Sequence, residues 1–152
     1  MTYRSKPYSM PEPPKQKLSS SLIKEMMDGP VSIAINGNCM QPVLQHGSRV
    51  SVQPAQIYWP GDILVFAKPD EQLLSHRLIG VLSRYDKLRT PRKRRTCFLT
   101  KADNSNQPDG WIVRDQIIGK VVIDIPVTTR LSCTFWFSRY LLAALFRRLT
   151  RC

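Results

Sequence analysis

The feature that most constrains the fold is a series of short runs rich in valine and isoleucine, which extends over residues 31–125. No run is longer than nine residues, and each partly alternates between apolar and polar side chains. The runs are VSIAI, SRVSV, DILVFA, HRLIGVL, TCFLTKA and IIGKVVIDI. Residues that favour turns separate them, among them Gly47, Pro60, Gly61 and Pro69. This pattern predicts a mainly β fold of one domain, either a meander or a small barrel.

The two ends of the chain differ from this β-rich middle. Proline and charge in residues 1–17 predict a flexible arm. Residues 18–28 predict a short helix that ends at the following Gly-Pro pair. Residues 131–152 have helical spacing instead, which predicts an amphipathic helix. We therefore expect an arm over 1–17, a domain over 18–130 and a helical tail over 131–152.

The net charge of +12 predicts an anionic partner, which could be nucleic acid, anionic lipid or an acidic peptide. No aromatic residue interleaves with the basic run at 89–95, which argues against nucleic acid. In the tail, one side of the predicted helix carries Phe135, Leu141, Leu142, Leu145, Phe146 and Leu149, and the opposite half carries Arg139, Arg147, Arg148 and Arg151. Its apolar stretch is too short to cross a bilayer. The tail therefore predicts either peripheral contact with an anionic membrane or packing onto the domain.

Cysteine usage limits the classes of site and the compartment. The four cysteines are Cys39, Cys97, Cys133 and Cys152. They form no CxxC pair, and no histidine lies at ligand spacing from them, so we expect no metal. No pattern predicts a cofactor. Residues 1–20 lack the apolar run of a signal peptide, which predicts a cytoplasmic protein with reduced cysteines.

One segment carries candidate chemistry, the sequence GNCMQPVL at residues 37–44. It resembles the G-x-S-M-x-P-x-L box of signal peptidase I enzymes and the related autoproteolytic repressors, with Cys39 at the position of the nucleophilic serine. Further segments resemble the other boxes of that superfamily in the same order: GDILVF at 61–66, SHRLIG at 75–80, TKADN at 100–104 followed by Asp109, and IGKVV at 118–122.

The resemblance, which spans residues 35–123, implies a β-rich peptidase with Cys39 as nucleophile. The SHRLIG box holds His76 followed by arginine, which is similar to the histidine-type members, so His76 is implied as the base. In that type an aspartate supports the histidine. Asp109 matches its position by register, and Asp103 is the second candidate.

The resemblance also bears on how the oxyanion and the substrate would be held. The backbone N–H of Cys39 is the expected first oxyanion donor, and the Asn38 side chain or a neighbouring N–H is the second. Some members use a serine hydroxyl two positions before the nucleophile, where this chain has Gly37. Met40 either packs in the domain or lines the substrate groove, and Pro42 belongs to the same box.

The residue types agree with this chemistry. Only a small fraction of an unactivated thiol is ionised at neutral pH. A nearby imidazolium stabilises the thiolate, and the imidazole can then protonate the leaving amine. The sequence thus predicts a peptidase that cleaves a peptide, leader or signal segment through a thioester. The alternative is an inactive module of the same fold that binds a peptide or a polyanion. A repressor-type autoprotease is disfavoured because no helix-turn-helix pattern precedes the first box.

Overall fold

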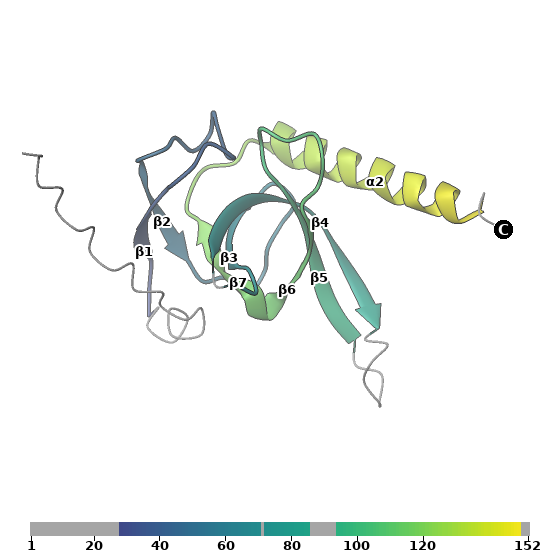
Figure 1. Cartoon of the computed structure of the whole chain (residues 1–152), viewed down its shortest axis with the longest axis horizontal. Coiled ribbons are helices and arrows are strands. Elements are labelled where there is room, and N and C mark those ends of the chain that lie inside the picture. Colours follow the sequence, from purple (N-terminus) through teal and green to yellow (C-terminus); the bar gives the residue numbers. More distant parts are fainter. Residues whose placement is uncertain (1–27, 71, 86–93, 150–152) are drawn as a thin grey trace, which may run out of the picture.

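The structure is a computed structural model that describes residues 28–70, 72–85 and 94–149. A seven-stranded antiparallel sheet is followed by one C-terminal helix (Figure 1), which confirms the mainly β fold. The elements are β1 (Val31–Ala34), β2 (Arg49–Gln53), β3 (Ile63–Ala67), β4 (Leu73–Tyr85), β5 (Arg94–Lys101), β6 (Gly110–Val113), the 3-10 helix η1 (Arg114–Gln116), β7 (Ile117–Val121) and α2 (Val127–Leu149). The arm over 1–17 and nearly all of the helix expected over 18–28 lie outside the described residues.

The strand order is β1-β2-β7-β3-β4-β5-β6, and the sheet is open. The barrel alternative is therefore wrong, because β1 and β6 form the two edges and do not pair with each other. A simple meander also fails, since β7 inserts between β2 and β3. Alternation along a strand determines which side chains are buried, but it does not determine whether the outer strands meet.

Apolar side chains form two clusters, and the alternation of β3 contributes to both. Ile63 and Val65 belong to the first cluster, whereas Leu64 and Phe66 belong to the second. The other members of the first are Ile35, Met40, Leu44, Val52, Ile118 and Val121, and those of the second are Tyr58, Leu78, Phe98, Ile112 and Ile117. All five residues of β3 are buried, as its continuous apolar run requires.

The helix α2 begins at Val127, so the expected boundary at residues 130/131 falls inside it. The carbonyl of Pro126 accepts the N–H groups of Thr129 and Arg130 in the first turn. Because this turn is polar, apolar spacing alone placed the start of the helix too late. Arg130 also pairs with the buried carboxylate of Asp62 at 3.0 Å, which fixes this end of α2 to the sheet. No helix in the described part of the chain is long and apolar enough to cross a membrane.

Gly119 in β7 is required by the close approach of β2. A Cβ atom at this position would lie 2.5 Å from the backbone oxygen of Gln53, which cannot rotate away. We expect Gly119→Ala to lower the free energy of unfolding by about 2–3 kcal/mol, as overpacking of a tight contact does. Urea unfolding measures this, with Gly29→Ala as control, because a Cβ at Gly29 meets nothing within 4 Å. Equal midpoints for the two variants would show that β2 and β7 adjust freely.

Candidate functional site

Cys39 lies on a turn in the loop between β1 and β2. Within this turn the N–H of Gln41 donates to the carbonyl of Asn38 at 3.1 Å, and the N–H of Leu44 donates to that of Met40 at 2.9 Å. The Met40 side chain is only 1% exposed and belongs to the first apolar cluster, so of its two expected roles the structure shows packing. This anchor leaves the neighbouring Cys39 half-buried at the surface of the cluster.

The residues around Cys39 determine the shape of the turn and leave the backbone N–H of Cys39 available as a hydrogen-bond donor. Gly37 has φ 120°, which favours glycine, and its N–H donates to Nδ1 of His46 at 3.0 Å. The Asn38 side-chain oxygen accepts a hydrogen bond from Gln41 at 3.1 Å. The Pro42 ring is exposed. Among the described residues, nothing accepts a hydrogen bond from the N–H of Cys39, so the expected first oxyanion donor is free to act.

Beside the thiol, β4 has a backbone edge that no described strand covers. Pairing of β4 with β5 begins at Arg77, opposite Lys101, although β4 itself starts at Leu73. The Cys39 Sγ lies 4.0 Å from the carbonyl oxygen of Ser75, within this stretch. Ser75 directly precedes His76, so the turn and the β4 strand bring the two expected catalytic residues into one region.

His76 is 7% exposed and faces a carboxylate. Its Nδ1 lies 2.7 Å from Oδ2 of Asp109, at hydrogen-bonding distance but without the alignment of a formed hydrogen bond. The imidazole also packs edge-on against the ring of Phe66, with the centroids 6.0 Å apart. Asp109 is positioned by its own N–H, which donates to the carbonyl of Thr100 at 2.9 Å. A carboxylate at Nδ1 leaves Nε2 as the nitrogen that can exchange a proton.

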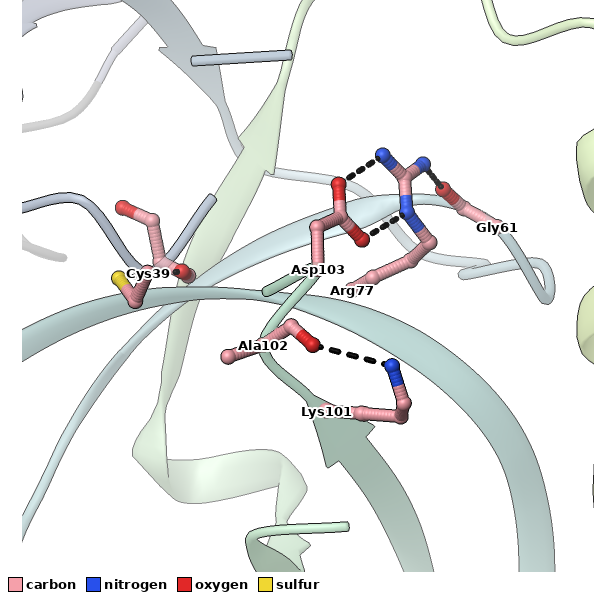
Figure 2. A network of polar contacts seen from close by, with 7 residues as sticks. Cys39, Gly61, Arg77, Lys101, Ala102 and Asp103 are labelled. Carbon is pink, nitrogen blue, oxygen red and sulfur yellow. Dashed lines mark hydrogen bonds and ion pairs between the residues drawn. The ribbon is translucent and has the colours of Figure 1, made fainter. Parts of the chain in front are cut away.

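Asp103, the other candidate, is held by Arg77 instead (Figure 2). The guanidinium donates from Nε and Nη2 to the two carboxylate oxygens, at 2.7 and 2.6 Å. Its Nη1 donates to the carbonyl of Gly61 at 2.8 Å. The structure therefore brings Asp109, not Asp103, to His76. The Arg77–Asp103 pair joins the end of β5 to β4 and to the turn before β3.

Asn104, which sequence reasoning gave no role, links the same loop to the nucleophile turn. Its N–H donates to the carbonyl of Cys39 at 3.2 Å, and its side-chain amide donates to the carbonyl of Asn38 at 3.0 Å. Asn104 lies in the TKADN segment and Arg77 in the SHRLIG segment, so both were within recognised motifs. Their contacts depend on which loops meet in the folded chain, which the spacing alone does not reveal.

The remaining cysteines are placed differently from Cys39. Cys97 is half-buried on β5, and Cys133 is buried on α2. Burial raises the pKa of the Cys133 thiol, and the nearby Asp103 carboxylate raises it further. Cys152 lies outside the described residues. Within the described part of the chain, no group of three or more His, Cys, Asp or Glu side chains could hold a metal ion.

Thr100 is fully buried, and its hydroxyl has no hydrogen-bond partner among the described residues. A buried hydroxyl without a partner costs free energy, and a methyl group of similar shape removes that cost. We expect Thr100→Val to leave the free energy of unfolding unchanged or to raise it by about 1 kcal/mol. Thermal unfolding beside Thr96→Val, an exposed position on the same strand, measures the difference. A clear loss of stability at position 100 alone would show that the hydroxyl is hydrogen-bonded.

Comparisons of the chain with protein-family models, with curated proteins and with solved structures found no match in any of the three.

Proposed function

We propose that this chain is an endopeptidase of the signal peptidase type that cleaves a peptide by cysteine–histidine catalysis. One observation carries the proposal: contacts at two neighbouring positions of β4 place Cys39 and Asp109 near the same part of the strand. Cys39 lies against the backbone of Ser75, and the adjacent His76 has Asp109 at 2.7 Å from its Nδ1. A nucleophile, a base and a carboxylate behind the base are the groups that acyl transfer needs.

The proposed reaction starts with transfer of the thiol proton from Cys39 to Nε2 of His76. The thiolate attacks the scissile carbonyl carbon, and the N–H of Cys39 donates to the resulting oxyanion. The imidazolium then gives its proton to the departing amine nitrogen as the C–N bond breaks, which leaves a thioester on Cys39. His76 next takes a proton from water as the water oxygen attacks the thioester. Finally the C–S bond breaks, and the proton returns to sulfur.

The uncovered edge of β4 suggests how a substrate would bind. Within the described part of the chain, no strand pairs with the backbone groups of residues 73–75 on the side where Cys39 lies. An extended peptide can add there as a strand, because main-chain hydrogen bonds provide affinity without a required sequence. Such a strand would run past the thiol. This supports a peptide, leader or signal segment as the substrate, and it favours cleavage in an unfolded part of the precursor.

The proposal is tested by limiting alkylation with iodoacetamide between pH 5 and 9, followed by peptide mapping. At pH 6 an unactivated thiol is about 1% ionised or less, so only an activated cysteine reacts quickly. Cys39 should be modified first, ahead of Cys97, which is also half-buried and serves as the internal control. The buried Cys133 should react last.

His76→Ala should remove the preference for Cys39 and leave the rate at Cys97 unchanged. Comparable rates at Cys39 and Cys97 in the unmodified chain would contradict the peptidase proposal. They would favour the alternative, a binding module in which the same groove holds a peptide or a polyanion without cleaving it.

A further inference from the structure

A stripe of apolar side chains runs along the outer side of α2. The outer stripe consists of Val127, Leu131, Phe135, Leu142 and Leu145, and each of these side chains is between 55% and 70% exposed. At 100° per residue the five positions lie within one third of the helix circumference. Single exposed apolar residues are ordinary on protein surfaces, whereas an aligned series of them, interrupted here only by Ser138, marks an interaction site.

The outer stripe lies on the side of α2 that faces away from the sheet. On the inner side, Cys133 is buried, and the ring of Phe137 covers Gly80 of β4 so closely that a Cβ there would lie 2.3 Å from it. Arg130 holds the start of the helix to Asp62. Among the described residues, the packing of α2 onto the sheet therefore uses a different set of side chains, and the outer stripe stays exposed.

The last part of α2 also extends past the sheet (Figure 1). Residues 142–147, which include Leu142 and Leu145, are all exposed. Short helical segments without packing are marginally stable in water, because tertiary contacts supply most helix stability in proteins. We therefore expect this exposed, apolar end of the helix to gain stability when it binds an apolar surface, either a lipid bilayer or another protein.

The charges on α2 indicate which kind of apolar surface the helix binds. Residues 127–149 contain no Asp or Glu; Arg139 is exposed beside the outer stripe, and Arg147 is exposed on the opposite side of the helix. The Arg139 guanidinium lies 5.9 Å from the centre of the Phe135 ring, at the margin of the stripe. The whole chain carries a net charge of +12. An apolar stripe bordered by arginine is the arrangement of helices that lie in the interface of an anionic bilayer.

We propose that α2 docks on an anionic lipid surface, with its axis along the membrane plane and the outer stripe among the acyl chains. A second copy of this chain fits the stripe less well, since dimerisation would bring two net charges of +12 and their arginines together. A nucleic acid would match the charge but would leave the apolar residues exposed to water. This inference does not depend on the proposed peptidase activity.

The test is flotation of the full chain with vesicles of phosphatidylcholine alone, or of phosphatidylcholine mixed with phosphatidylglycerol. The chain should float with the mixed vesicles, and high salt should weaken the binding. The variant Leu142→Glu/Leu145→Glu should lower the partition coefficient by roughly tenfold or more relative to its control, because both leucines lose their burial in lipid. The matched control is Ala143→Glu/Ala144→Glu, which adds the same charge at exposed positions on other sides of the same turn.

Equal losses in the two double variants would overturn the proposal, because charge alone would then explain the binding. Absence of flotation with the mixed vesicles would also overturn it. Sedimentation of the lipid-free chain at increasing concentration tests whether a second copy of the chain binds the outer stripe. A dimer that Leu142→Glu/Leu145→Glu abolishes would assign the outer stripe to a second copy instead. Circular dichroism of each variant confirms that the fold is retained.

Discussion

Asp109→Asn is expected to lower the rate at which Cys39 is acylated by roughly 10³- to 10⁴-fold, the loss seen when the carboxylate behind a catalytic histidine becomes an amide. The amide can donate to Nδ1 of His76, which would stabilise the tautomer that carries its proton on Nε2. That tautomer cannot accept the thiol proton. The burst of p-nitrophenol released from p-nitrophenyl acetate measures acylation without knowledge of the natural substrate.

Two other variants make this measurement specific. Asp124→Asn changes an exposed carboxylate and should leave the burst unchanged. Asp103→Asn should lower the free energy of unfolding, because it weakens the two hydrogen bonds from Arg77. At temperatures where the chain is folded, this variant should retain most of the acylation rate. If Asp103→Asn loses acylation and Asp109→Asn does not, the observed contact of Asp109 with His76 has no role in catalysis.

Arg77→Met is expected to lower the free energy of unfolding by about 3–5 kcal/mol, because it breaks a largely buried ion pair from one side. Arg77 is 8% exposed and holds both Asp103 and the carbonyl of Gly61. The methionine would leave the Asp103 carboxylate without its partner in a poorly hydrated position. A loss of this size is a large part of the stability of a small domain, which is about 5–15 kcal/mol. Urea unfolding, followed by the fluorescence of the three tryptophans, measures it.

The double variant Arg77→Met/Asp103→Leu distinguishes the cost of an unpaired charge from the cost of lost packing. Replacing both charges by apolar groups removes the unpaired carboxylate, so most of the lost stability should return. Arg77→Lys should recover little, because an ammonium group cannot donate to both carboxylate oxygens and to Gly61 in the same geometry. If Arg77→Met costs less than about 1 kcal/mol, the pair behaves as a surface ion pair and does not hold the two loops together.

The positions of most strands could be predicted from sequence, because period-two alternation and turn residues are local signals. The place of β7 could not be predicted in this way. Its pairing with β2 and β3 joins segments far apart in the chain, and the pattern of a buried strand is the same wherever it inserts. The spacing in the tail correctly indicated an amphipathic helix. However, Cys133 and Phe137 form the packed side, whereas much of the expected apolar side is exposed.

The sequence predicted which segments contribute to the candidate site, but not which of their side chains come into contact. The GNCMQP and SHRLIG segments predicted Cys39 and His76, and the register favoured Asp109 but left Asp103 as a second candidate in the same turn-rich loop. The two aspartates make different contacts in the folded chain, where Arg77 lies against Asp103 and His76 lies against Asp109. The same limit applies to Asn104, whose two hydrogen bonds to the nucleophile turn cross a wide separation in sequence.

The central place of β7 has a consequence for the timing of synthesis. The turn that carries Cys39 belongs to the β1–β2 hairpin, whereas His76 and Asp109 belong to the block from β3 to β6, and β7 is the strand that pairs with both parts. A ribosome adds about 5–20 residues per second. Until it has made residues 117–121, the two halves of the proposed active site have no strand to join them. If the chain is the proposed peptidase, we expect no cleavage of unfolded polypeptides by the emerging chain until β7 has been made and has paired with both parts.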